Sequence, residues 1–234
     1  MVASCTAMKV QIKKLIAIMS KILLWLDFGS KLTSGNKFYL VRLHSQESNS
    51  LLLTLSSFEK CHFNINGQNN IVKSTEATVS GTSISIEGAG NRLEIESGVV
   101  LRNATVIIRG MCCSIFIGKG TSCGGMRLVN VGHGCTISIG ANCMISDQVE
   151  IWSSDTHPIR TAQGEVINPE ASVNIGDHVW LGSRTTVLKG VTIGNGSVIG
   201  MGSVVTRDVP ANTVSVGNPN RTVRENINWT IHHE

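Results

Sequence analysis

The sequence predicts an all-β solenoid of triangular cross-section, in which short parallel strands stack coil upon coil. Aliphatic residues recur every six positions, which is neither the 3.6-residue period of a helix nor the alternation of a half-buried strand. Glycine is abundant, at 24 of 234 residues, whereas only 4 residues are proline and the first of them is Pro158. Proline would remove a donor from a strand ladder, so its absence before this point fits a stacked sheet.

The six-residue period is unbroken in the C-terminal part of the chain. A short strand and a turn form one hexad, and three hexads form one coil. Each inward aliphatic side chain then stacks on its counterpart in the next coil at a strand spacing of about 4.7–4.9 Å. The inward positions of this stretch are Ile175, Leu181, Val187, Ile193, Ile199 and Val205.

Further upstream, the hexads come in groups of three that begin 22 residues apart, at Ile95, Ile117 and Ile139. Each coil therefore carries about four extra residues at one corner, and these corners form a wall along one edge. We expect roughly seven coils between about residues 60 and 210. The inward positions predicted here are Ile95, Leu101, Ile107, Ile117, Cys123, Val129, Ile139, Ile145 and Ile151.

Positive charge is concentrated at the N-terminus. Residues 1–42 hold seven Lys and Arg and one acidic residue, a net charge of +6, whereas the remainder has a net charge of −2. The body has no basic stripe, which argues against nucleic-acid binding. Residues 8–28 have the apolar spacing of a basic amphipathic helix and too many lysines for a membrane span. We expect this helix to pack on the body or a partner subunit, or to make peripheral contact with an anionic membrane face.

The chain contains seven cysteines, an odd number, and no C-x-x-C pair. Reduced thiols packed as small apolar groups are the simplest interpretation, and they favour the cytoplasm. The basic segment over residues 8–28 adds the inner membrane face as an expected peripheral site. The charge distribution and the repeat divide the chain into an N-terminal extension over 1–45, a solenoid domain over 46–215 and a C-terminal tail over 216–234.

One long insertion interrupts the repeat between Ile151 and Ile175. This loop, 152–174, contains His157 and two of the four prolines. A long excursion from a rigid repeat is typical of a functional loop.

Several motifs in and after this loop resemble the hexapeptide-repeat acyltransferases, in particular the branch with sugar and capsular sialic-acid O-acetyltransferases. That resemblance covers about residues 115–229. It implies a left-handed parallel β-helix, acetyl-CoA as the donor, a homotrimer, and active sites in clefts between subunits. The motifs are D-T-H-P-I (155–159), I-G-D-H-V-W-L-G-S (175–183), V-I-G-M-G-S-V-V-T-R-D-V-P (198–210), V-G-N-P-N-R-T-V-R (216–224) and E-N-I-N-W (225–229).

The resemblance assigns the catalytic histidine to His157. A sugar hydroxyl is a poor nucleophile until a base takes its proton, and neutral imidazole suits this role near pH 7. Asp155 either orients this ring or caps the loop. Trp180 matches a tryptophan that lies beside the thioester arm and excludes water. His178 is interpreted as structural.

The same resemblance assigns the donor site, and no metal is expected. The small residues allow close backbone approach, Ser183 and Met201 contact the pantetheine arm, and the arginines pair with the nucleotide phosphates. The full cofactor-binding set is Trp180, Gly182, Ser183, Gly200, Met201, Thr206, Arg207, Arg221 and Arg224.

The expected acceptor is a sugar hydroxyl in a surface polysaccharide, such as a capsule, or in its precursor. Galactoside-type enzymes carry an acceptor-binding asparagine where the 22-residue register places Met126, which argues against simple galactosides. Trp152 and Asp147 lie near the loop base and are candidates for acceptor contact.

Three alternatives remain beside an O-acetyltransferase. The first is an N-acetyltransferase acting on a nucleotide-linked amino sugar or a xenobiotic. The second is a zinc hydrase, which needs three histidines, two of them five residues apart; His133, His157 and His178 have other spacings. The third is a non-catalytic solenoid scaffold.

Overall fold

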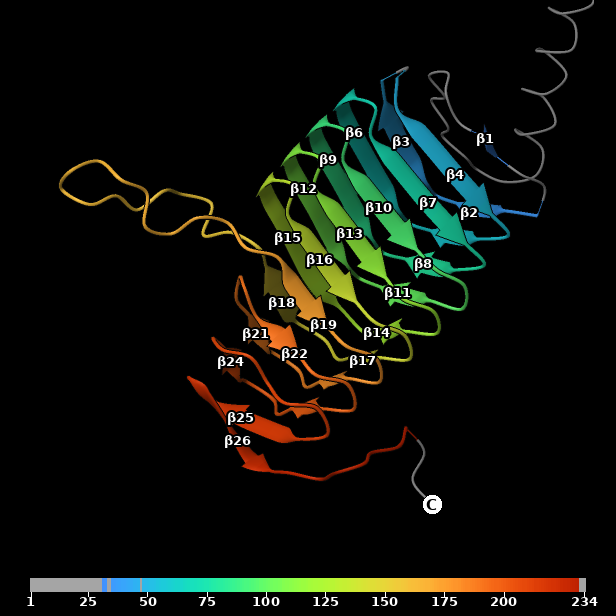
Figure 1. Cartoon of the computed structure of the whole chain (residues 1–234). Coiled ribbons are helices and arrows are strands. Elements are labelled where there is room, and N and C mark those ends of the chain that lie inside the picture. Colours follow the sequence, from blue (N-terminus) through green and yellow to red (C-terminus); the bar gives the residue numbers. More distant parts are fainter. Residues whose placement is uncertain (1–30, 33–34, 47, 232–234) are drawn as a thin grey trace, which may run out of the picture.

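The structure is a computed structural model that describes residues 31–32, 35–46 and 48–231. The helix expected over residues 8–28 lies outside this range. Within it every regular element is a strand, and three long parallel sheets form the sides of a left-handed β-helix (Figure 1). The expected fold class is thereby confirmed.

Each coil contributes one strand to each sheet, in the order A, B, C. Sheet A has eight strands: β1 (Lys31–Leu32), β4 (Ser50–Thr54), β7 (Ile71–Thr75), β10 (Arg92–Ile95), β13 (Ser114–Ile117), β16 (Thr136–Ile139), β19 (Val173–Ile175) and β22 (Thr192–Ile193).

Sheet B continues past the last complete coil into an antiparallel pair. Its ten strands are β2 (Lys37–Tyr39), β5 (Ser57–Glu59), β8 (Thr78–Ser80), β11 (Val100–Arg102), β14 (Ser122–Cys123), β17 (Met144–Ile145), β20 (Trp180–Leu181), β23 (Val198–Ile199), β25 (Val214–Gly217) and β26 (Asn220–Arg224).

Sheet C has the longest strands in its middle. Its eight strands are β3 (Arg42–Ser45), β6 (His62–Gln68), β9 (Ser83–Ala89), β12 (Thr105–Met111), β15 (Met126–His133), β18 (Val149–Trp152), β21 (Thr186–Val187) and β24 (Val204–Val205). β1, β2 and β3 make a first coil, so coils begin before the boundary expected at residue 46.

The core is a column of stacked aliphatic side chains along the axis of the solenoid. Ile95, Ile117, Ile139, Ile175 and Ile193 face one another in adjacent strands of sheet A and are at most 3% exposed. All other positions predicted to face inward also belong to this core, except two.

Ile107 and Val129 were predicted to face inward, and this is wrong. On the outer face of sheet C, Ile107 pairs with Val129, which is 3% exposed, and Val129 pairs with Trp152, whereas Val106 and Leu128 occupy the core. The corner before sheet C is one residue shorter in these coils than in the later ones, and a one-residue shift turns every side chain of a strand to the other face.

The four extra residues of the 22-residue coils lengthen the strands of sheet C rather than forming loops. β6, β9, β12 and β15 run on into this edge and remain paired up to Gln68, Ala89, Met111 and His133. The extended ends of these four strands form a ridge along this edge. Gly110 in the ridge has φ +130°, and a Cβ there would lie 1.9 Å from the carbonyl oxygen of Gly132. Glycine is therefore required for the close stacking of the ridge.

Buried asparagines form hydrogen bonds with backbone N–H and carbonyl groups at the corner between the ridge and sheet A. The Asn91 side chain is 0% exposed; its Oδ1 accepts from the Cys113 N–H at 3.0 Å, and its Nδ2 donates to the Gly110 carbonyl at 3.0 Å. Asn70 makes the matching contacts one coil earlier. A polar side chain at 0% exposure is tolerated because its partners are backbone groups of the neighbouring coils.

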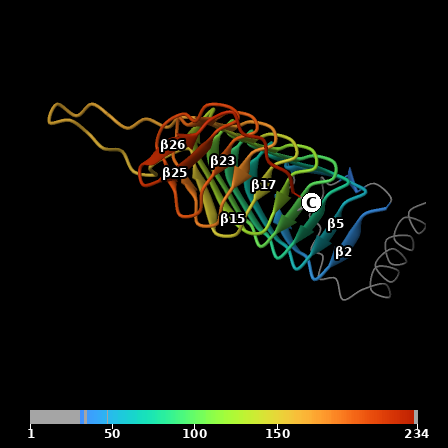
Figure 2. The same ribbon diagram turned by 90° about the horizontal axis from the view of Figure 1, so that it is seen from below.

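The last strands close one end of the prism, and the tail then runs back along its side (Figure 2). Ile227 N–H donates to the Asn212 carbonyl at 3.0 Å, and Trp229 is 8% exposed. The part of the chain described here contains no helix that could cross a membrane.

Candidate active site

The predicted functional loop is a finger that projects far from the prism between β18 and β19 (Figures 1 and 2). It leaves from the edge between sheets C and A, beside the end of the long sheet-C ridge. Its tip is a short antiparallel hairpin in which Arg160 bridges to Val166, and the Ile167 N–H donates to the Ile159 carbonyl at 2.9 Å. The apolar side chains of the tip are largely exposed, Ile159 at 55% and Ile167 at 59%.

His157 lies at the neck of the finger with its backbone fixed and its ring free. Its N–H donates to the Asp155 carbonyl at 2.8 Å, and its own carbonyl accepts from Asn168 Nδ2 at 3.0 Å. Thr156 before it adopts φ +63°, a left-handed backbone conformation at a bend in the chain. No group among the described residues hydrogen-bonds the imidazole, which is exposed and available to a substrate.

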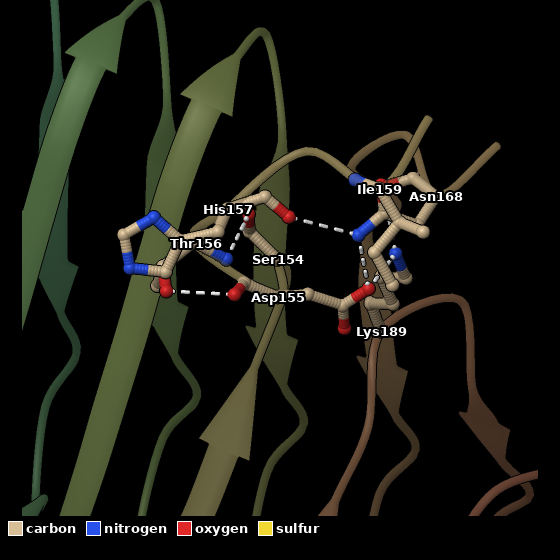
Figure 3. Close-up of polar contacts among 7 residues, drawn as sticks. All are labelled: Ser154, Asp155, Thr156, His157, Ile159, Asn168 and Lys189. Atoms are coloured by element: carbon tan, nitrogen blue, oxygen red, sulfur yellow. Dashed lines mark hydrogen bonds and ion pairs between the residues drawn. The ribbon is translucent and has the colours of Figure 1, made fainter. Parts of the chain in front are cut away.

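The Asp155 carboxylate faces away from this ring (Figure 3). Its Oδ2 accepts from Lys189 Nζ at 2.6 Å and from Asn168 Nδ2 at 2.8 Å. These hydrogen bonds hold the pKa of Asp155 below its usual range, first through Lys189 and then through Asn168. Of the two roles expected for Asp155, the geometry supports anchoring the loop rather than orienting the imidazole.

Trp180 lies on the outer face of sheet B in β20, paired with Met144 and Val198 of the adjacent strands. Its Nε1 is buried and has no hydrogen-bond partner among the described residues. Trp229 of the tail lies beside it, with ring centroids 5.9 Å apart. A buried indole N–H usually has a partner, so this atom marks a place where a ligand group could bind.

The tail tryptophan is itself held by His178. Their rings stack at 4.1 Å with an interplanar angle of 3°. Trp229 Nε1 donates to the His178 carbonyl at 3.0 Å, and His178 Nε2 lies 3.0 Å from the Trp229 carbonyl. These contacts agree with a structural interpretation of His178.

Gly182, Ser183, Gly200 and Met201 lie together at the edge between sheets B and C. A Cβ on Gly182 would lie 2.7 Å from the Met201 nitrogen, so only glycine fits between these coils. Ser183 Oγ donates to the Asp147 carboxylate, and Met201 is 65% exposed. The corner is therefore open to solvent.

Thr206, predicted to contact the coenzyme, and the arginines predicted to bind its phosphates lie at the closing end of the prism. Thr206 and Arg207 follow β24, and Arg221 and Arg224 belong to β26. All four are exposed, and none of the three guanidinium groups forms an ion pair within the described ranges. These cations are free to meet an anionic ligand.

The predicted site residues divide between two edges of one chain. His157, Thr206 and Arg207 lie at the edge between sheets C and A, whereas Ser183 and Met201 lie at the edge between sheets B and C. The full width of sheet C separates the two groups. One chain therefore does not bring His157 and the pantetheine residues into one pocket.

The histidines considered as zinc ligands and the residues considered for acceptor binding lie at separate places in the fold. His133 ends β15, and His178 lies at the corner before β20. No three His, Cys, Asp or Glu side chains of the described residues cluster as metal ligands. Met126 is 3% exposed in the core, while Trp152 lies on the outer face of sheet C, where its Nε1 donates to Glu150 at 2.9 Å.

Sequence reasoning missed three residues around the site: Asn168, Lys189 and Trp229. Lys189 is 34 residues from Asp155 and belongs to the next coil, so only stacking of the coils brings the two together. Trp229 ends the E-N-I-N-W motif that was noted for resemblance, and that motif was the one available signal of its role.

Comparison with known proteins agrees with this fold. Residues 172–207 match the bacterial transferase hexapeptide (six repeats) family. The polysialic acid O-acetyltransferase of Escherichia coli O1:K1 / APEC is 35% identical over 117 residues, which cover 49% of this chain and 38% of that protein. The galactoside O-acetyltransferase of Escherichia coli K12 is 42% identical over 93 residues, covering 38% of this chain and 44% of that protein.

Two solved structures match almost the whole prism. The polySia-specific acetyltransferase NeuO superposes with a TM-score of 0.75 at 26% identity, covering 88% of this chain and 89% of that chain. The polysialic acid O-acetyltransferase OatWY gives a TM-score of 0.75 at 28% identity, covering 89% and 93%.

In fold, repeat and sequence motifs, this chain is similar to the hexapeptide-repeat acyltransferases. Its similarity extends to the polysialic acid O-acetyltransferases over nearly the full prism. In sequence, the chain spans about half the length, or less, of the curated relatives it matches.

Proposed function

We propose that this protein is an acetyltransferase that moves an acetyl group from acetyl-CoA to a hydroxyl of a sugar in a surface polysaccharide or its precursor. The observation that carries the proposal is His157, whose backbone is fixed at both its N–H and its carbonyl while its ring is exposed. The similarity to O-acetyltransferases named for polysialic acid and galactosides supports a sugar hydroxyl as the acceptor.

In this proposal His157 is the general base. Its neutral imidazole takes the proton of the acceptor hydroxyl as that oxygen attacks the thioester carbonyl. The new C–O bond forms, the C–S bond breaks, and the coenzyme leaves as a thiolate that takes a proton. Because a thiolate is a good leaving group, a single imidazole suffices and no second strong acid is needed.

The residues assigned to the donor fit a long thioester arm that ends in phosphates. Trp180 offers an apolar face and a buried N–H without a partner in the described structure. The Gly182 corner allows close approach of the chain to the arm. Arg207, Arg221 and Arg224 supply guanidinium groups for the phosphates, a pairing that is strong because both partners are charged.

The separation of the two edges supports a homotrimer. If the proposal is right, the His157 edge of one subunit faces the Trp180 and Ser183 region of its neighbour, and each cleft contains residues of two chains. A symmetric ring of three copies would then contain three equivalent sites.

We also propose that the protein is cytoplasmic or peripheral at the inner membrane face. The six cysteines of the described residues are free, which supports a reducing compartment. The basic segment over residues 8–28 is proposed to contact the body, a partner subunit or the membrane surface.

The test is transfer by the purified full chain from acetyl-CoA to a panel of sugars and amino sugars. Release of the free thiol measures turnover, and mass spectrometry of the product identifies the acceptor. Alkali-labile acetyl groups indicate an ester, whereas stable ones indicate an amide and the N-acetyltransferase alternative. No transfer to any acceptor, with no binding of acetyl-CoA, would leave only the scaffold alternative.

A further inference from the structure

The neck of the finger is tied to the body of the prism by one cation, Lys189. This residue follows β21 in the next coil, and its side chain is only 19% exposed. Its Nζ donates to Asp155 Oδ2 at 2.6 Å and to the Asn168 carbonyl at 2.8 Å. The ammonium group therefore bonds both arms of the finger, the outgoing arm at Asp155 and the returning arm at Asn168 (Figure 3).

The two arms are also bonded to each other at this point. Asn168 Nδ2 donates to Asp155 Oδ2 and to the His157 carbonyl, and Asn168 Oδ1 accepts from the Ile159 N–H. Asp155 in turn supplies the carbonyl that accepts from the His157 N–H. Both backbone anchors of His157 thus belong to the residues that Lys189 bonds.

We propose that Lys189 is a positioning residue for His157, acting through Asp155 and Asn168. The inference rests on the proposed function, because it assigns His157 to the reaction. Lys189 touches no reacting atom. It sets where the imidazole stands relative to the prism, and so relative to a donor bound along it. The finger beyond Ile159 is exposed, so contacts at its tip within this chain cannot replace this anchor.

The expected effect follows from geometry. Loss of the ammonium group leaves the Asp155 carboxylate and the Asn168 carbonyl without a donor from the body, so the neck can shift by a fraction of an ångström or more. Misplacement of a catalytic group by about 1 Å costs on the order of 100-fold in rate. The predicted pantetheine residues Ser183 and Met201 lie at another edge of the prism and are unaffected.

The experiment compares the full-length Lys189→Met variant with wild type and with a matched control, Lys119→Met, a solvent-exposed lysine at a corner of an earlier coil. In Lys189→Met we expect kcat to fall about 10- to 100-fold while KM for acetyl-CoA stays within about twofold and the melting temperature is retained. Lys189→Arg should recover part of kcat. Lys119→Met should match wild type.

A double variant and hydrogen exchange give the structural readout. Asp155→Asn should lower kcat alone, and adding Lys189→Met should cost little more, because both break one network. Amide exchange at His157 and Ile159 should be faster in Lys189→Met.

Unchanged kcat together with unchanged exchange would overturn the proposal, and so would an equal loss in kcat and donor affinity. Failure of wild type to transfer acetyl overturns the proposed function and the positioning role with it. The exchange measurement then still shows whether Lys189 fixes the neck.

Discussion

Replacing His157 with alanine separates chemistry from stability in this protein. The ring makes no hydrogen bond within the described structure and is exposed, so its removal should change the free energy of unfolding by no more than about 0.5 kcal/mol. General-base catalysis contributes about 10²- to 10⁴-fold, which corresponds to about 2.7–5.5 kcal/mol of transition-state stabilisation. We therefore expect kcat to fall by that factor with KM for acetyl-CoA nearly unchanged.

The assay is thiol release from acetyl-CoA in the presence of the acceptor identified from the sugar panel, with thermal unfolding measured in parallel. His133→Ala is the matched control, because His133 is an exposed histidine at the end of β15 and is assigned no role. Turnover of the His157→Ala variant within about threefold of wild type would refute the general-base assignment, provided the control is also active.

Three further predictions concern the donor site, the core and the loop neck. Arg221→Ala should raise KM for acetyl-CoA about tenfold or more with a smaller change in kcat, because one charge-assisted hydrogen bond to the donor is lost. The control Arg42→Ala, at the other end of the prism, should leave KM for acetyl-CoA unchanged. Unchanged donor affinity in Arg221→Ala would contradict the phosphate role. Asn91→Ala should lower the free energy of unfolding by about 2–4 kcal/mol in denaturant titrations, because it leaves a buried backbone N–H and a half-buried carbonyl without their partner. Carbon NMR should show the Asp155 carboxyl titrating below its ordinary pKa of about 3.9 in wild type and at a higher pH in Lys189→Met, since the ammonium favours the charged form of the carboxyl. The ion pair then stabilises the neck above pH 4 and is lost as the pH falls through the lowered pKa of Asp155. Equal titration midpoints in the two proteins would exclude this pairing.

The hexad period was sufficient to predict the fold and most of the core. An aliphatic residue at every sixth position can be buried only if the chain turns after each short strand, so Ile95, Ile117 and Ile139 could be placed from the sequence alone. The period failed at Ile107 and Val129, because one residue fewer at a corner reverses the facing of the next strand. It also did not reveal the first coil, whose strands β1 to β3 lack the regular aliphatic spacing.

Only part of the candidate site could be predicted from the sequence. The motif around His157 singled out one imidazole, and the motifs of later coils singled out Trp180 and the arginines. The anchoring of the loop could not be derived, because Asp155 and Lys189 meet only where adjacent coils stack. The sequence likewise did not show that Trp229 returns along the prism to stack on His178.

The sequence by itself determined the repeat and the direction of burial in most coils, because these depend on residue type and local spacing, and its motifs pointed to His157 as the proposed base. Only the tertiary structure decided which partners surround that base and which edge of the prism each donor residue occupies. The physical reason is that stacking brings together residues about one coil apart in the chain, and small changes in corner length, invisible in composition, set which of them meet.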